Sequence, residues 1–408
     1  MEETLVKLIA PVRGRTQTEK WGARGAFATL VALAMLSAFA PPAHAAGDYV
    51  FTKVVDSAAD NFNPQTLRLA CPSINTRGDI AFKSERGAVD GIYRANVGGG
   101  LTPIFEVPLG GGALLANGNP SMNDTGQVSF GASADGVQTI MRGDGTTLTT
   151  IARESTQRRG FTSFGRETSI NDAGEVAFDA VLDSGAEGLF SGTGGATTTH
   201  YLDTEDASVD GNTARFTATS DRPSINNLGD IAFVDQIQGA SDRDIFRGQD
   251  RSFTTISASN PPTGLLPPLL NNAGTVAWET SFIDDETELF ATAIVTGNGD
   301  PDVPDTRIVD SSGAFEIFHS YALNNAGAVA FSATLDDDNL AIPAIFVGPN
   351  PKKNRVIRPG DKLDGGTVVG LNFCEEGLND SGQLAFVAEI EDRNGDVRVG
   401  VFRATLRK

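Results

Sequence analysis

The sequence predicts an all-β fold, a seven-bladed β-propeller of four-stranded antiparallel blades closed by the N-terminal strand. Three observations lead to this prediction. One short signature recurs seven times, four short strands fit into the stretch that follows each copy, and one additional strand precedes the first copy. A unit of about 50 residues with four short strands matches a propeller blade in length.

The repeated signature combines an Asn, a Gly three residues later and an aromatic residue after four more. Its seven copies are SINTRGDIAF, SMNDTGQVSF, SINDAGEVAF, SINNLGDIAF, LLNNAGTVAW, ALNNAGAVAF and GLNDSGQLAF, with the Asn at Asn75, Asn123, Asn171, Asn226, Asn271, Asn324 and Asn379. An Asn side chain accepts hydrogen bonds from amides within a tight turn, and Gly allows positive φ. Apolar residues precede the Asn and alternate after the Gly, so each copy predicts a β-hairpin.

The order of the strands predicts how the ring closes. The last repeat ends after three strands, whereas residues 49–56 (YVFTKVVD) stand alone before the first repeat. Pairing of this segment with the last repeat would remove an unpaired sheet edge.

The two cysteines, Cys71 and Cys374, precede the first and last signatures, and those repeats are neighbours in a closed ring. We predict a disulfide between them, worth on the order of 5 kcal/mol in the chain-entropy model. Two free thiols are the alternative.

The first 45 residues have the features of a secretory signal peptide. Five basic residues precede an apolar run at residues 27–40, and Ala43-His44-Ala45 offers the small residues of a cleavage site. We therefore expect a signal peptide at 1–45 and a single propeller of seven repeats at 46–408. The expected location is secreted or periplasmic, through a bacterial Sec-type pathway. We expect no membrane span in the mature form, because no second apolar run follows.

The charge of the chain restricts its partners. The formal charge is -20, and removal of five basic and three acidic residues with the first 45 takes it to -22. Such a chain is a poor partner for nucleic acid or an anionic membrane. The charge either keeps the protein soluble outside the cell or attracts cations and basic ligands. We expect the mature protein to be a monomer.

The seven signatures resemble a bacterial family of exported tandem-repeat proteins, the NxxGxxAF "choice-of-anchor" proteins. The resemblance spans about residues 49–407. It implies export and a repeat architecture. The family carries no established reaction, so the resemblance implies no catalytic residue.

Candidate ligand-binding residues follow from the topology. In a propeller, the links between blades share one face with the mouth of the central channel, and loops over a rigid scaffold are common ligand sites. The residues three to five positions before each Asn should line this mouth. The charged and polar ones form the candidate site: Arg166, Glu167, Asp221, Arg222, His319, Tyr321, Glu375 and Glu376. The alternative is a set of solvated ion pairs.

No catalytic or metal motif stands out. After processing, only His200 and His319 remain as imidazoles, and nothing marks a nucleophilic Ser beside them. Ligand-spaced His and Cys for zinc are missing. No cofactor is indicated, although the oxygen-rich loops at residues 297–305, 335–339 and 391–396 leave calcium open.

These observations favour a secreted, non-enzymatic propeller that binds a glycan or another exported protein. The alternative is a carbohydrate-active hydrolase or lyase, with Glu375, Glu376 and His319 at the channel mouth as acid–base groups. A structural component of a surface layer is a third hypothesis.

Overall fold

The computed structural model describes residues 48–111, 113–115, 118–157, 160–217, 222–257, 262, 266–336 and 342–407. They belong to one compact unit, Ala40–Lys408. The expected signal peptide, residues 1–45, lies outside the described residues. Within the described ranges, no helix has the length and apolar character needed to cross a bilayer.

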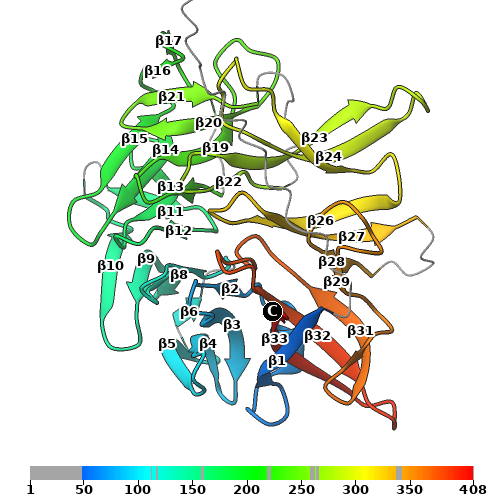
Figure 1. Ribbon diagram of the computed structural model, residues 1–408. Helices are drawn as coiled ribbons and strands as arrows, with labels where there is room; N and C mark the ends of the chain where they lie inside the picture. The colour runs from blue at the N-terminus through cyan, green and yellow to red at the C-terminus, as the bar shows by residue number, and fades with distance from the viewer. Residues whose placement is uncertain are drawn as a thin grey trace, which may run out of the picture. The chain divides into compact units, whose positions relative to one another are not determined.

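Seven sheets confirm the predicted propeller (Figure 1). We number the blades by the order of their Asn turns. Blades 1 to 3 contain β2 (Ser73–Ile74), β3 (Ile80–Arg86), β4 (Val89–Ala95) and β5 (Leu101–Pro108); β6 (Ala113–Leu115), β7 (Ser121–Met122), β8 (Val128–Ala134), β9 (Val137–Gly143) and β10 (Leu148–Arg153); and β11 (Phe161–Phe164), β12 (Ser169–Ile170), β13 (Val176–Leu182), β14 (Glu187–Gly192) and β15 (Thr198–Leu202).

Blades 4 to 7 repeat this antiparallel pattern, and blade 4 adds the hairpin β16 (Ala207–Val209) and β17 (Asn212–Ala214), in which β16 pairs parallel to β21. The remaining strands are β18 (Ser224–Ile225), β19 (Ile231–Asp235), β20 (Asp244–Gln249) and β21 (Ser252–Thr255); β22 (Leu269–Leu270), β23 (Val276–Ile283), β24 (Phe290–Gly297) and β25 (Thr306–Asp310); β26 (Phe315–Leu323), β27 (Val329–Leu335), β28 (Ala344–Phe346) and β29 (Arg355–Ile357); and β30 (Lys362–Leu363), β31 (Gly366–Asn372), β32 (Leu384–Glu391), β33 (Val397–Leu406) and β1 (Tyr49–Asp56). One short helix, α1 (Pro64–Leu67), precedes β2.

The innermost strands follow one another around the axis. β2 contacts β7, β7 contacts β12, and the series continues through β18, β22 and β26, while β2 also contacts β32 of blade 7. This arrangement places blades 1 and 7 side by side, as the closure prediction requires.

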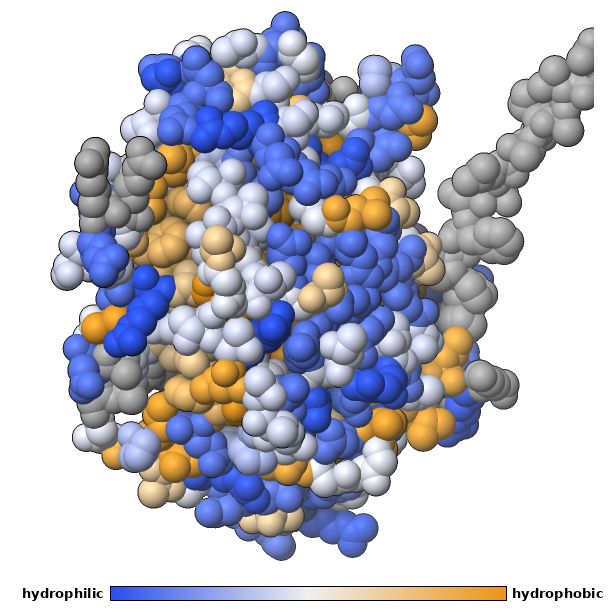
Figure 2. Space-filling view, turned by 90° about the vertical axis from the view of Figure 1, so that its left-hand side faces the viewer, coloured by the Kyte–Doolittle hydropathy of each residue, from blue (hydrophilic) through white to orange (hydrophobic). Residues whose placement is uncertain are grey.

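The hydrophobic core lies within and between the blades. In five blades the aromatic residue of the signature is directly opposite an aromatic residue of the next strand, with ring centroids 5.5–5.9 Å apart. Such cross-strand pairs stabilise a sheet beyond the area they bury. The outer side shown in Figure 2 is mainly hydrophilic, with apolar residues gathered in separate patches.

The N-terminal strand closes the ring as predicted. β1 pairs antiparallel with β33, from Tyr49 opposite Leu406 to Asp56 opposite Gly400, and Figure 1 shows the two strands side by side. The predicted disulfide is also confirmed: Cys71 and Cys374 are bonded, with their Cα atoms 5.4 Å apart.

Four charged residues add an ion-pair network at the rim of the closure. Lys53 and Arg398 each contact both Asp56 and Asp364, at nitrogen–oxygen distances of 2.7–3.1 Å. These contacts tie β1 to β33 and to the turn between β30 and β31.

The Asn turns form a hydrogen-bonded ring around one end of the channel, which we call the turn end. Each Asn accepts, through Oδ1, the amide of the residue four positions later, and each turn Gly has positive φ. In blades 2 to 7 the Asn Nδ2 also donates to the carbonyl oxygen of the Asn in the next blade, at 2.7–3.3 Å. The residue after the Asn links the blades again: from Asp124 to Asp380, its Oδ1 accepts the amide of the equivalent residue in the preceding blade.

Arginine side chains strengthen the same end. Arg94, Arg142, Arg247 and Arg403 follow the aromatic or Met residue of the third strand in their blades, and each donates to the carbonyl oxygen of the turn Gly in the next blade. The signature therefore specifies contacts between blades as well as the hairpin within each blade.

Candidate functional site at the channel

A girdle of apolar side chains divides the central channel. It consists of the residue that precedes each Asn, one from every blade: Ile74, Met122, Ile170, Ile225, Leu270, Leu323 and Leu378. These seven residues line a cavity on either side of them, so the girdle lies between the two cavities. One cavity, of about 160 Å³, lies at the turn end. The other, of about 210 Å³, opens toward the links between blades, and we call it the channel cavity.

The channel cavity is lined by equivalent positions from six blades. The residue four positions before the Asn contributes Cys71, Asn119, Glu167, Arg222, Pro267 and Glu375. The next position contributes Pro72, Pro120, Thr168, Pro223, Pro268 and Glu376. The cavity therefore combines one arginine and three carboxyl groups with a wall rich in proline.

Interruptions of the innermost strand bring these residues into the channel. In blades 1, 3 and 7, the segments 63–72, 165–168 and 373–377 lie between two stretches that pair with the second strand. An interrupted strand leaves amide groups without ladder partners, and proline has no amide hydrogen to satisfy. In blade 1 the interruption accommodates Pro72, whereas blades 3 and 7 have Thr168 and Glu376 at the same position.

Glu376 is fixed by hydroxyl groups of two neighbouring blades. Its carboxyl oxygens accept hydrogen bonds of 2.5 Å from Ser73 Oγ and Ser121 Oγ, and a third of 3.2 Å from the Met122 amide. Burial raises the pKa of Glu376, and these hydrogen bonds oppose the increase. The side chain is thus a fixed part of the cavity wall.

Glu167 and Glu375 share a single cation. Arg222 Nε lies 3.7 Å from Glu167 Oε2, and Arg222 Nη1 lies 3.7 Å from Glu375 Oε1. Asn119 Nδ2 donates to Glu167 at 3.1 Å. Burial, followed by the charge of Glu375, raises the pKa of Glu167 to about 7. Burial also raises the pKa of Glu375.

Three of the candidate residues lie elsewhere. Arg166 and His319, five positions before the Asn, are exposed and do not line the channel cavity. Tyr321 is 1 % exposed in the core of blade 6, and its hydroxyl donates to the Pro267 carbonyl oxygen. Blade 6 differs because β26 runs from Phe315 to Leu323 without a second segment, which keeps Tyr321 against the sheet. Asp221 lies outside the described residues.

His200 belongs to a buried hydrogen-bond chain. Its Nδ1 accepts the Asp250 amide at 3.2 Å, so the proton resides on Nε2, which lies 2.9 Å from Ser191 Oγ. Ser191 in turn donates to Glu175 at 2.5 Å. With His200 2 % exposed and its Nε2 acting as donor, this Ser–His pair lacks the geometry of an activated nucleophile.

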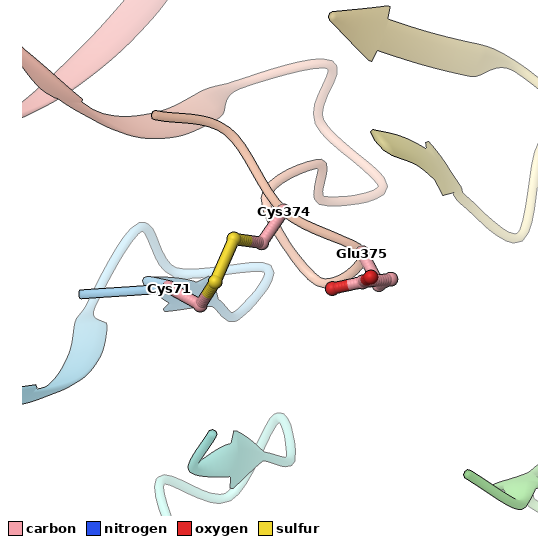
Figure 3. A group of neighbouring side chains, drawn as sticks. All are labelled: Cys71, Cys374 and Glu375. Atoms are coloured by element: carbon pink, nitrogen blue, oxygen red, sulfur yellow. A yellow bond between two sulfur atoms is a disulfide. The ribbon is translucent and has the colours of Figure 1, made fainter. Parts of the chain in front are cut away.

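One side-chain group near the cavity has the composition of a metal site. The sulfur atoms of Cys71 and Cys374 and a carboxyl oxygen of Glu375 lie within 4.8 Å of one another. Figure 3 shows these three side chains. The sulfur atoms are joined in the disulfide, so they are not available as thiolate ligands.

Two of the oxygen-rich loops, residues 297–305 and 391–396, contain carboxylates that accept hydrogen bonds from backbone amides of their own turns. Calcium binding at these loops stays a prediction.

The chain can now be assigned to a family, because one family model matches residues 43–403. The chain belongs to a family of unknown function (DUF7453). No curated protein matches it. The family model therefore covers the whole repeat region, but it assigns no activity to the chain.

Solved structures similar to this family member have low sequence identity. One comes from a study of two prolyl endopeptidases, with 13 % identity and a TM-score of 0.47. The match covers 86 % of this chain and 52 % of that one. A second is YCF48 bound to a D1 peptide, with 8 % identity and a TM-score of 0.43; the match covers 88 % of this chain and 97 % of that one. A third is the β-propeller domain of the Trilobed protease from Pyrococcus furiosus, with 9 % identity and a TM-score of 0.36; the match covers 72 % of this chain and 99 % of that one. The chain spans about half the length of the prolyl endopeptidase chain, and these similarities concern the fold alone.

Several residues that build the site were not predicted from the sequence. Ser73 and Ser121 belong to the signature, whereas Asn119 and the prolines directly precede it and carry no charge that would mark them as candidates. A signal was present, since PSIN, PSMN and PPLLN place proline at the same offset in several repeats.

Proposed function

We propose that this chain is an exported, non-enzymatic β-propeller that binds a glycan or another exported protein at the channel cavity. A propeller is a scaffold suited to interaction, because its rigid blades hold variable loops around one axis. One observation carries the proposal. Glu167, Arg222, Glu375 and Glu376 come from three blades and converge in a cavity that the apolar girdle bounds on its inner side. Export, and the resemblance to the NxxGxxAF proteins, enter the proposal as predictions from the sequence.

A ligand screen tests the location. The chain from residue 46 onward is melted in the presence of polysaccharides, peptides and small amines, because a ligand of the native state raises the melting temperature by mass action. A ligand found in this way is then titrated against Glu375→Gln. We expect a loss of affinity of roughly tenfold or more, as for removal of a charged hydrogen-bonding partner.

Glu316→Gln is the matched control, since Glu316 is exposed on β26 and the substitution removes the same charge. Binding that weakens equally in both variants would place the site elsewhere. A screen without any hit would count against the binding function itself.

A carbohydrate-active hydrolase or lyase is the second candidate function. The raised pKa of Glu167, about 7, favours it, because a general acid must remain protonated near neutral pH. His319 does not line the cavity, so the carboxyl groups alone would supply the acid and the base. The test is release of reducing ends from a polysaccharide panel, with loss of activity in Glu167→Gln. Absence of product from substrates that bind would exclude this candidate.

A further inference from the structure

We propose that the channel cavity receives a primary ammonium group, presented as a lysine side chain by a protein partner. This inference rests on the proposed function and specifies the ligand of the same site. It follows from the charges in the cavity, from the character of its wall and from a second surface on the same face.

The charges in the cavity are not balanced. Three carboxyl groups face one guanidinium, and Glu376 is already held by hydroxyl and amide donors. Arg222 lies 3.7 Å from both Glu167 and Glu375, beyond hydrogen-bond distance, and its side chain is 42 % exposed. A buried carboxyl group stays ionised only beside a partner charge and otherwise takes up a proton. An ammonium group between Glu167 and Glu375 would supply it, and the raised pKa values of these carboxyl groups agree with the missing cation.

The wall of the cavity suits the methylene stem of lysine. Pro72, Pro120, Pro223, Pro267 and Pro268 line it, and the apolar girdle forms its inner boundary. A lysine side chain buries its methylene groups on apolar surface while its ammonium reaches polar groups. The volume of about 210 Å³ is below the range of about 300–1,000 Å³ that is usual for small-molecule sites. One side chain therefore fits better than an oligosaccharide.

A second surface on the same face as the cavity favours a protein partner. The hairpin of β23 and β24 turns at the end of blade 5 opposite its Asn turn, on the face where the channel cavity opens. Its tip exposes Ile283 (49 %), Leu289 (67 %) and Phe290 (85 %). Four of the six residues in its loop, DDETEL at 284–289, are acidic. An exposed apolar group surrounded by carboxylates suits a protein surface with apolar and basic residues, and it disfavours an anionic membrane.

The test measures binding of Nα-acetyl-lysine amide by calorimetry at pH 8, where Glu167 is mainly ionised. Nα-acetyl-norleucine amide is the neutral comparison, and glucosamine presents the same ammonium on a sugar. We expect millimolar binding of the lysine probe, at least fivefold weaker binding of the norleucine probe, and roughly tenfold loss in Glu375→Gln with no change in the control Glu316→Gln. We also expect Arg222→Ala to strengthen lysine binding, because it removes the competing cation.

Each other outcome separates this inference from the proposed function. If a neutral glycan binds and depends on Glu375 while the lysine probe does not bind, the ammonium assignment is wrong and the binding function stands. Tighter binding of glucosamine than of the lysine probe would replace the protein partner with an amino sugar. Weaker lysine binding in Arg222→Ala would also overturn the proposal, since Arg222 would then be a ligand contact. If neither the probes nor the glycan panel bind, both proposals fail.

Discussion

The two ends of the channel are built from the same seven repeats, but they differ in how much the residues at equivalent positions vary from repeat to repeat. At the turn end, every blade contributes an Asn, a Gly and a residue that links it to its neighbour, and the hydrogen bonds repeat from blade to blade. At the cavity end, three or four residues before the Asn, six of the blades contribute cysteine, asparagine, glutamate, arginine, threonine or proline. The apolar girdle lies between the two ends.

This difference separates structural from functional requirements within one repeat. The turn end must satisfy the same buried amides seven times, so one solution recurs. The cavity end carries charged groups whose pKa values are raised, an arrangement that stability alone does not favour. Differences between repeats at equivalent positions therefore mark the candidate site.

The largest expected effect comes from the one covalent link at the cavity end. Replacing both cysteines (Cys71→Ala with Cys374→Ala) releases a loop that closes over a sequence separation of 303 residues. The chain-entropy model predicts a loss of about 5 kcal/mol in the free energy of unfolding. Guanidinium unfolding of the variant measures it, with the reduced wild-type protein as the control. A loss below about 1 kcal/mol would mean that β1 and the ion pairs of Lys53 and Arg398 hold the closure without the disulfide.

The second effect concerns the turn end. In Asn226→Ala, the amides of Leu228 and Asp230 lose their acceptor and the Asn271 carbonyl oxygen loses a donor. Buried groups left without partners cost about 1–3 kcal/mol each, so we expect a total of about 3 kcal/mol in unfolding experiments. Asn226→Asp keeps the acceptor oxygen and should lose less.

Asn394→Ala is the matched control, because this asparagine also lies in a hairpin turn but is exposed, and its side-chain amide donates to Asp392 of its own loop. We expect a change within about 0.5 kcal/mol. Equal losses in Asn226→Ala and Asn394→Ala would show that the Asn acts within its own turn alone, and that the links between blades add nothing.

How much could be predicted from the sequence follows from the same comparison. The fold, the closure by residues 49–56 and the Cys71–Cys374 bond depend on local turn chemistry and on strand order, which are both visible in the sequence. The links from Asn to Asn across blades were not predicted, since the turn already accounted for the Asn. At the cavity end, Glu167 and Glu375 line the channel cavity, at the offset from the Asn that the topology suggests. Tyr321 lies in the core instead, because β26 runs as one strand from Phe315 to Leu323, and no residue of the signature reports that.

The smallest effect is a pH dependence that originates at the cavity end. The pKa of Glu167 rises from 4.5 to about 7 on folding, so the folded protein binds more protons than the unfolded chain between these values. Its contribution to stability is therefore fully present below pH 4.5 and decreases as the pH rises toward 7. Glu375, Glu376, Arg222 and Asn119 are the groups that act on it. Since the side chain is one-fifth exposed, we expect the free energy of unfolding to decrease by about 2 kcal/mol over this range.

The Glu167→Gln side chain cannot titrate, so this variant should lose that part of the decrease. Unfolding experiments at pH 4.5, 5.5, 6.5 and 7.5 would measure it. An unchanged slope in Glu167→Gln would show that this carboxyl group is ionised in the folded protein. Arg222 would then already neutralise it, and the cavity would need no further cation.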